Sequence, residues 1–278
     1  MKVALPLKWG AWVGVVVSFL AALLATLRSV ETTFNVAATT EFVEFRADSF
    51  SMPTWRLYDV TLARGLDAQV RFDSIELRFS PGVRIRLERI SFGPLRIGAA
   101  SADGIGGVGA LFHPDGSSSE LAAEFIALLP DIAEGARRGR VATLPVVGQM
   151  QLGTGGAVVS GRAILRSGSV TMLDRAILGS TRFDVRTVSL DAGDSFIVQS
   201  PQGPAVGVIR ADERPAMSAA YRVLGKRAQV SRFASQGYTM STSLRDRILK
   251  DHVLQGIWLT TLALIGLANR FGKRIIPS

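Results

Sequence analysis

Two apolar stretches, one near each end of the chain, constrain the fold more than any other feature of the sequence. The stretch Trp9–Leu27 contains 19 residues without a charge and is bounded by Lys8 and Arg28. As a helix it would extend roughly 28 Å, close to the hydrocarbon thickness of a bilayer. Trp9 and Trp12 lie at its start, and indole rings favour the membrane interface. We therefore predict a transmembrane helix over residues 9–27.

A cleaved signal peptide is the alternative for this N-terminal stretch. Lys2 and Lys8 would suit its basic start, but Leu24 and Leu27 stand where small residues are needed for cleavage. Val36–Ala38 offers a small-residue site, although it lies far beyond the apolar run. A buried soluble helix is rarely apolar on all sides, so a retained anchor is the favoured interpretation.

The second stretch, Val253–Asn269, contains 17 residues without a charge and includes Gln255 and two threonines. A helix of that length spans roughly 26 Å, the lower limit for crossing a bilayer. Ser243 is a plausible N-cap, and apolar residues follow it at helical spacing. We predict one helix over residues 243–269 that contains a second transmembrane span. The alternative is an amphipathic or core-packing C-terminal helix.

The distribution of charge predicts the orientation. The formal net charge is +9, and the tails, residues 1–8 and 270–278, hold five of the basic residues and no acidic one. Basic flanks of membrane helices stay in the cytoplasm, which places residues 28–242 outside it. Arg245, Arg247 and Lys250 precede the second helix and oppose this orientation weakly. We predict a two-pass protein of the plasma (inner) membrane, and attribute the high pI to these flanks rather than to a nucleic-acid partner.

Alternating hydrophobicity predicts antiparallel strands in the first half of the middle segment. Ile75, Leu77 and Phe79 alternate with charged residues, and the same pattern resumes over 83–87 after Ser80–Gly82. Such alternation across a Pro-Gly turn predicts a hairpin with one buried face. Further strands are predicted around Tyr58–Leu62, Val70–Phe72 and Ile90–Phe92.

A helix is predicted after the glycine-rich residues 101–116. Ser117 and Glu120 form a capping-box pattern, and Leu121, Phe125 and Leu128 follow at helical spacing. We expect this helix to run over 117–129 and to end at Pro130.

Residues 136–156 are irregular and form a candidate boundary within the 28–242 domain. Short strands punctuated by Gly, Asp and Pro return after them, and their spacing is typical of a sandwich or barrel. We predict them at Ala163–Leu165, Val170–Leu173, Phe183–Leu190, Phe196–Val198, Val206–Ile209 and Tyr221–Leu224. The predicted fold class is mainly β: an antiparallel sandwich or barrel-like extracytoplasmic domain flanked by two transmembrane helices.

Two short motifs invite a chemical interpretation. Gly104–Gly109 matches the dinucleotide pattern G-x-G-x-x-G, but Pro114 breaks any following helix, so a flexible turn is expected. Gly193–Phe196 resembles the nucleophile block of GDSL-type hydrolases. It lies late in the chain, and His252 lacks the aspartate three residues earlier that the resemblance requires, so we expect a β-turn here.

The remaining candidates for chemistry are few. The absence of cysteine excludes thiolate nucleophiles, zinc–cysteine sites and iron–sulfur ligation. His113 and His252 are the only histidines, and neither has neighbours in sequence that would complete a metal site or a triad. Trp55 is expected to be a packing anchor. We therefore predict no catalytic, cofactor-binding or metal-binding residue.

Two functions of different classes remain open. The first is a non-enzymatic scaffold, assembly or binding protein of the cell envelope. Its partners would be the lipid bilayer and another envelope protein, a lipid or a cell-wall polymer, with no cofactor and no nucleic acid. The alternative is a membrane-bound hydrolase or transferase that uses scattered carboxylates, for which Asp191 with Asp194 and Asp212 with Glu213 are the candidate pairs.

Overall fold

The computed structural model describes residues 4–27, 31–48, 53–64, 68–104, 106–129, 142–153, 164–176, 181–212, 214–232 and 235–274. Within these ranges the protein is mainly β, with 17 strands joined into a large antiparallel sheet and three helices. The predicted mainly-β fold class is confirmed. The chain divides into a helical unit, Met1–Thr32 with Met172–Arg186 and Thr242–Ser278, and a β unit, Thr33–Thr171 with Thr187–Ser241.

The strands are short to medium in length and follow one another closely along the chain. The first nine are β1 (Thr32–Thr40), β2 (Phe42–Ala47), β3 (Trp55–Arg64), β4 (Ala68–Phe79), β5 (Arg84–Glu88), β6 (Leu95–Ala100), β7 (Gly109–Phe112), β8 (Ser118–Leu121) and β9 (Glu124–Leu129). The others are β10 (Ala142–Leu152), β11 (Leu165–Arg175), β12 (Arg182–Leu190), β13 (Ser195–Gln199), β14 (Ala205–Ala211), β15 (Met217–Gly225), β16 (Arg227–Arg232) and β17 (Ser235–Met240).

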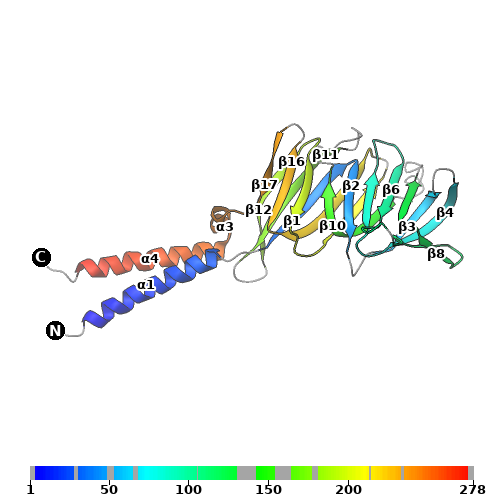
Figure 1. The fold of residues 1–278 in the computed structure, drawn as a ribbon. Helices are drawn as coiled ribbons and strands as arrows, with labels where there is room; N and C mark the ends of the chain where they lie inside the picture. Colours follow the sequence, from blue (N-terminus) through cyan, green and yellow to red (C-terminus); the bar gives the residue numbers. More distant parts are fainter. Residues whose placement is uncertain are drawn as a thin grey trace. The chain divides into compact units, whose positions relative to one another are not determined.

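The first half of the β unit is a continuous antiparallel run of strands. β2 pairs with β5, β5 with β6, β6 with β9, and β9 with β3. β3 then pairs with β4, β4 with β7, and β7 with β8. Figure 1 shows β2, β6, β3 and β4 following one another on one side of β10. Non-sequential neighbours such as β9 and β3 show that the chain folds back on itself here.

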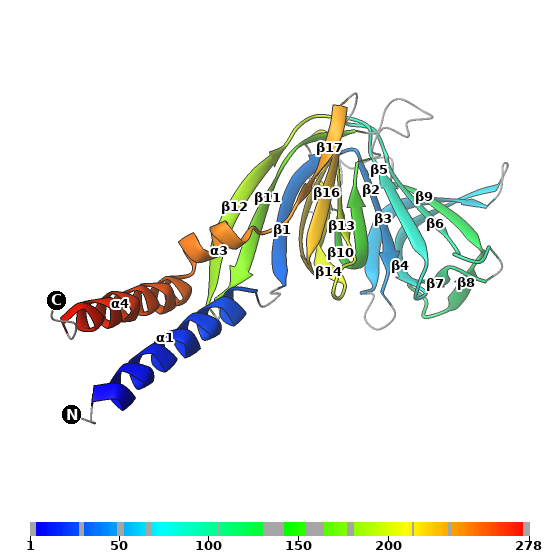
Figure 2. The same ribbon diagram turned by 60° about the vertical axis from the view of Figure 1, so that its left-hand side comes forward.

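β10 connects the two halves of the β unit. One edge pairs with β2 over Gly148–Leu152. The other edge pairs with β14 over Ala142–Gly148 and then with β13 at Gln151 and Leu152. We call the position between these two partners, at Gln149 and Met150, the β10 fork. β15 continues from β14, while β16 and β17 continue from β13, and Figure 2 shows these strands grouped around β10.

The hairpin predicted across Ser80–Gly82 is wrong, because its two strands do not pair with each other. The prediction of which side chains of these strands are buried is correct. Leu77 and Ile85 are fully buried, as the alternation predicts. However, β4 pairs with β3 and β7, whereas β5 pairs with β2 and β6, so the two strands have no free edges for each other. The turn itself is present, with Gly82 at φ +78° and its amide donating to Ala47 O at 2.9 Å. It carries the chain from one set of neighbours to another.

The core of the first half is organised around an aromatic cluster. Trp55 is fully buried and contacts the rings of Phe45 and Phe79 at centroid distances of 6.0 and 5.1 Å. Its indole Nε1 donates to Pro145 O on β10 at 2.7 Å, so its polar atom is satisfied as well. The prediction that Trp55 is a packing anchor is confirmed.

A strand predicted at Ile90–Phe92 is a turn in the structure, because a polar network holds it. The Arg89 guanidinium is buried and donates through Nη1 to Arg214 O at 3.0 Å and Ala216 O at 2.8 Å. Ser91 adopts φ +51°, and its amide donates to the buried Glu41 carboxylate at 3.1 Å. The apolar side chains that suggested a strand are therefore exposed.

The helix predicted over 117–129 is wrong. The structure has β8 and β9 there, and in β9 the side chains of Phe125, Ala127 and Leu129 are buried while Ile126 and Leu128 are half-buried. This is the two-residue period of a strand. The capping-box pattern is a short local signal, and pairing of β9 with both β6 and β3 overrides it.

The helices lie at the two ends of the chain: α1 (Ala4–Leu27), α3 (Leu244–Lys250) and α4 (His252–Arg274). Ser243 caps α3 as predicted, its hydroxyl accepting from the Asp246 amide at 3.1 Å. The single helix predicted over 243–269 is wrong, because Asp251 leaves the helical conformation and its carboxylate caps α4 instead. Figure 1 shows α1 and α4 side by side, and Phe19 contacts Trp258 edge to face at 5.8 Å.

Neither α1 nor α4, over its described residues, has a segment long and apolar enough to be identified as a membrane span.

Adjacent leucines in β9 test the strand assignment. Leu129→Ala should lower the free energy of unfolding by about 2–5 kcal/mol, because Leu129 is buried. Leu128→Ala should have a clearly smaller effect, because that side chain is half-buried. Urea denaturation of the full chain in detergent, followed by tryptophan fluorescence, measures both. A larger effect at Leu128 would indicate the helical spacing instead.

Candidate functional site

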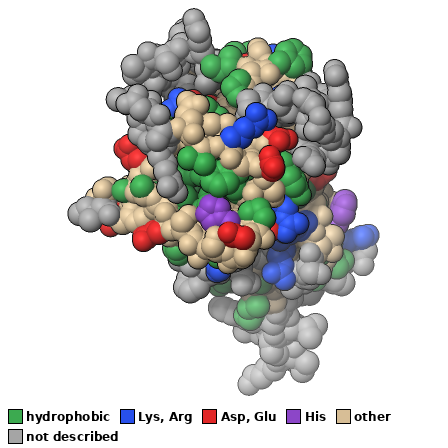
Figure 3. Space-filling view, turned by 90° about the vertical axis from the view of Figure 1, so that its right-hand side faces the viewer, with side chains coloured by type: hydrophobic (Ala, Val, Ile, Leu, Met, Phe, Trp, Pro, Cys, Tyr) green, Lys and Arg blue, Asp and Glu red, His purple; other side chains and the backbone are tan. Residues whose placement is uncertain are grey.

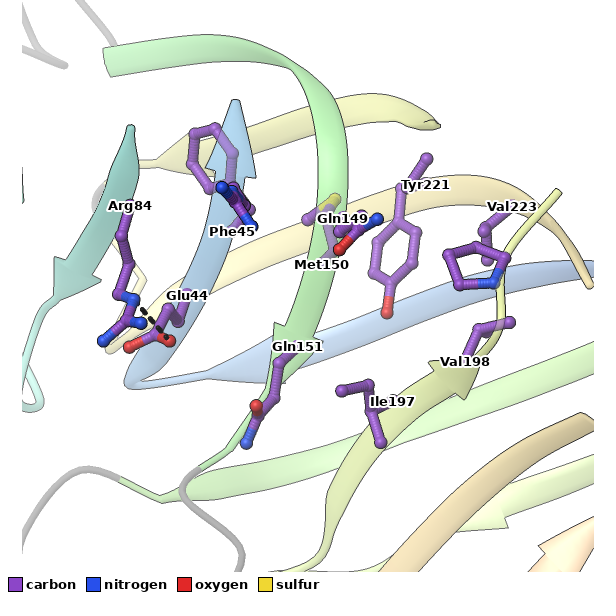
Figure 4. A pocket seen from close by; sticks show the side chains of 13 residues that line it. Glu44, Phe45, Arg84, Gln149, Met150, Gln151, Ile197, Val198, Tyr221 and Val223 are labelled. Atoms are coloured by element: carbon purple, nitrogen blue, oxygen red, sulfur yellow. Dashed lines mark ion pairs between the residues drawn. The ribbon is translucent and has the colours of Figure 1, made fainter. Parts of the chain in front are cut away.

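A pocket of about 220 Å³ opens at the β10 fork, within the β unit. Figure 4 shows its lining side chains converging from several strands. Those that belong to the buried face are Phe45, Met150, Val198, Ala205, Tyr221 and Val223. The remaining lining residues, which are exposed or half-buried, are Glu44, Arg46, Arg84, Gln149, Gln151, Ile197 and Pro201.

The pocket exists because β10 changes its neighbour. Gly148 is the last β10 residue opposite β14, and Gln151 is the first opposite β13. The chain passes from β13 to β14 through a turn in which Ser200 and Gly203 adopt positive φ, and Pro201 of this turn lines the pocket. The intervening side chains of β10 therefore border a gap between two strands rather than a continuous sheet.

Tyr221 on β15 supplies a buried polar atom of the pocket. The residue is only 5% exposed, and its hydroxyl oxygen is buried without a hydrogen-bond partner among the described residues. Burial raises the pKa of this phenol well above its usual range, so the group stays protonated. Figure 4 shows the hydroxyl directed away from the β15 backbone, toward Ile197.

Gly207 has no side chain and so leaves room for Tyr221. It lies opposite Tyr221 in the β14–β15 register, and a Cβ there would come within 2.3 Å of Tyr221 Cβ. Any other residue at 207 would therefore displace the tyrosine or the strand.

Arginine outnumbers acid at the mouth of the pocket. Glu44 forms ion pairs with Arg86 at 2.6 Å and with Arg84 at 3.8 Å. Arg46 donates through Nε to Gly82 O at 3.1 Å. The mouth is therefore polar, and it carries more basic than acidic side chains.

A second polar site lies within the helical unit, and we call it the Asp174 junction. Asp174 on β11 is 1% exposed, and its Oδ1 accepts from Thr32 Oγ1 at 2.9 Å. Thr32 and Thr242 share a hydrogen bond at 2.8 Å, and Arg247 of α3 places Nε 3.8 Å from Asp174 Oδ2. Burial raises the pKa of Asp174, and the hydrogen bond from Thr32 and the charge of Arg247 oppose that shift only in part.

The motif residues singled out in the sequence do not join either site. Gly104 adopts φ +71°, and β7 begins at Gly109, so a strand rather than a helix follows this glycine-rich segment. Ser195 is buried at the start of β13, after a turn closed by the Asp194 amide donating to Asp191 O at 3.1 Å. Arg232 pairs with both aspartates, at 3.2 and 3.6 Å, so this carboxylate pair stabilises a turn.

The two histidines lie in unrelated settings. His113 follows β7; its ring contacts Phe72 at 5.4 Å, and its Nε2 is 3.4 Å from Ser119 Oγ. His252 begins α4 and is exposed. Figure 3, viewed toward the β4 and β8 end, shows hydrophobic, acidic and basic side chains intermixed. No group of three or more potential metal-ligating side chains occurs among the described residues.

The sequence did not single out the fork pocket. Tyr221 appears there only as one member of an alternating strand, and Gln149 and Met150 fall inside the segment that looked irregular. Their importance arises from the change of partner along β10, which has no local signature.

Comparison with known proteins gives no match: no family model, curated protein or solved structure is similar to this chain. The function is therefore argued from the chain's own geometry.

The Asp174 junction predicts how stability depends on pH. The folded pKa lies above the ordinary value of 3.8, so just above that pH the folded protein keeps a proton that the unfolded chain releases. The free energy of unfolding should therefore fall as the pH rises through this interval. Asp174→Asn should flatten that slope. Thermal unfolding of the full chain between about pH 4 and about pH 7 compares this variant with the wild type; equal slopes in wild type and Asp174→Asn would contradict the assignment.

Proposed function

We propose that this is a membrane-anchored, non-enzymatic binding protein of the cell envelope, with α1 and α4 in the bilayer and the β unit outside the cytoplasm. One observation carries the proposal: α1 and α4 contact each other and still expose large apolar side chains. Val16 and Leu24 of α1 are 58% and 63% exposed, and Leu259 and Leu262 of α4 are 67% and 59% exposed. Hydrocarbon chains would cover these surfaces at no solvation penalty, whereas water would not.

The polar side chains of α4 are compatible with a lipid environment. Thr260 and Thr261 donate their hydroxyls to Gly256 O and Ile257 O, each at 2.8 Å. A polar group inside a bilayer needs such an internal partner, because no water is present to supply one. In the sequence, the residues from Trp9 to Leu27 carry no charge, as the proposed anchor requires.

The orientation rests on the basic tails, which favour the cytoplasm. The cations just before α4 are the main objection to this orientation. One of them, Arg247, is 7% exposed and lies in the Asp174 junction, where it balances an acidic side chain. The rule counts cations rather than net charge, so Arg245, Arg247 and Lys250 all oppose this orientation.

Binding is a better interpretation than catalysis because of what the candidate carboxylates do. Asp191 and Asp194 are ion-paired to Arg232, and Asp212 accepts a hydrogen bond from the Arg214 amide. These are turn-stabilising roles. The fork pocket instead offers a shaped, largely apolar cavity with a few polar groups, which is typical of a ligand site.

Matched substitutions of exposed valines test the anchoring. Val17 on α1 is 60% exposed and Val206 on β14 is 52% exposed. Val17→Arg should reduce the fraction of chain that remains in membranes after alkaline extraction, because a mid-helix arginine opposes insertion by roughly 3 kcal/mol. Val206→Arg should leave that fraction unchanged. Equal behaviour of the two variants, or complete extraction of the wild type, would refute the anchor.

Single cysteines test the topology, since the chain has none of its own. Ser117→Cys, in the exposed turn before β8, should react with a membrane-impermeant maleimide on intact right-side-out vesicles. Lys2→Cys and Ser278→Cys should react only after the vesicles are permeabilised. Labelling of Ser278→Cys in intact vesicles would place the C-terminus outside and contradict the proposed arrangement.

A further inference from the structure

We propose that the pocket at the β10 fork binds an uncharged ester or amide carbonyl joined to a short hydrocarbon segment, with the Tyr221 hydroxyl as the hydrogen-bond donor. This deepens the proposed binding function. It rests on that function for the source of the ligand, but its chemistry follows from the pocket alone. The choice of ligand rests on the Tyr221 hydroxyl, which has no partner among the described residues, and on the apolar walls around it.

The hydroxyl defines what the ligand must offer. Buried polar groups in folded proteins almost always have a hydrogen-bond partner, and an unsatisfied one is strongly unfavourable. The Tyr221 hydroxyl has none among the described residues and points into the pocket (Figure 4). Burial keeps this phenol protonated, so its proton is available to an acceptor on the ligand.

The apolar walls of the pocket favour an uncharged hydrogen-bond acceptor on the ligand. Phe45, Met150 and Val223 are buried apolar residues that line the cavity around the tyrosine. A carboxylate or phosphate placed beside them would lose its hydration for a single hydrogen bond, which is unfavourable. The arginines at the mouth do not offset this, because the Arg46 and Arg84 side chains are exposed to water, where their attraction for an anion is weak, whereas Tyr221 is only 5% exposed. An ester or amide carbonyl accepts the same hydrogen bond without that penalty.

The volume sets the size of the bound segment. A cavity of about 220 Å³ holds roughly seven groups of about 30 Å³ each. This suits one carbonyl with a few methylenes, and is smaller than the pockets that enclose a drug-sized molecule. Ile197, which is 39% exposed, and the Gln149 and Gln151 side chains border the opening, where a longer molecule would continue outward.

The experiment uses the full chain in detergent with butyl acetate as the probe and heptane, of the same chain length, as the matched probe without a hydrogen-bond acceptor. Methionine methyl groups labelled with ¹³C report binding, because Met150 lines the pocket. Met150→Leu assigns its signal. Butyl acetate should shift the Met150 methyl resonance in a saturable way. Tyr221→Phe should weaken binding of butyl acetate about tenfold, as expected for loss of one hydrogen bond, and should not weaken binding of heptane.

Two controls keep the result interpretable if one variant is disturbed. Tyr238→Phe removes the same hydroxyl from a tyrosine outside the pocket and should bind both probes like the wild type. Ile197→Trp narrows the mouth at a partly exposed position, where folding tolerates change, and should weaken both probes. Equal weakening of butyl acetate and heptane binding by Tyr221→Phe would overturn the donor role. Absence of saturable shifts with either probe would mean that an ordered water alone satisfies the hydroxyl, and would overturn the site.

A final comparison distinguishes a membrane lipid from a free small molecule as the source of the carbonyl. The full chain is placed in nanodiscs of ester-linked or of ether-linked phospholipid with the same headgroup. The lipid ester is identified as the ligand if the Met150 methyl resonance differs between the two lipids. Butyl acetate should then reverse that difference only in the ester-linked lipid. Identical shifts with retained butyl acetate binding identify a free molecule. The detergent measurements do not require membrane anchoring, so a failed anchor and a failed pocket give different results.

Discussion

The hydrogen bonds along the two edges of β10 are the constraint on which the β unit depends. On one edge β10 holds β2, and through it the whole run of strands from β5 to β8. On the other edge it holds β14 and then β13, and through them β15, β16 and β17. The indole of Trp55 adds a side-chain bond to the β10 backbone at Pro145. Because one strand serves three partners, its far edge cannot be filled continuously, and the fork pocket is the consequence.

The helical unit depends on side-chain contacts rather than on pairing between strands. Its two long helices contact each other through side chains such as Phe19 and Trp258, yet they leave apolar surface uncovered. Its polar groups are concentrated in the Asp174 junction, where strands and α3 meet. A buried carboxylate with a raised pKa is an unfavourable element on its own, and the hydroxyls and the arginine around it are what make its burial tolerable.

The local sequence pattern predicted well which side chains of a strand are buried, and predicted poorly which strands pair with each other. Alternation assigned Leu77 and Ile85 to the buried side correctly, because the side-chain direction along a strand depends only on its two-residue period. It then paired the strands around Ser80–Gly82 with each other, whereas each has partners elsewhere in the sheet. The segment 117–129 failed for the same reason, since its capping-box pattern is local and the pairing of β9 is not. The break at Asp251 was missed because an aspartate at that spacing fits either a helix or a cap.

By itself the sequence determined the mainly β character of the middle of the chain, the apolar helices at its ends and the burial of Trp55, because these follow from composition and periodicity within short windows. Only the tertiary structure decided which strands are neighbours, and therefore where β10 changes partner. The candidate site depends entirely on that decision. Tyr221 is one more inward-facing residue of β15 in the sequence. Its hydroxyl becomes a buried donor with no partner among the described residues only because β10, β13 and β14 diverge beside it. Hydrogen bonds between strands distant in the chain set that geometry, and no local pattern encodes it.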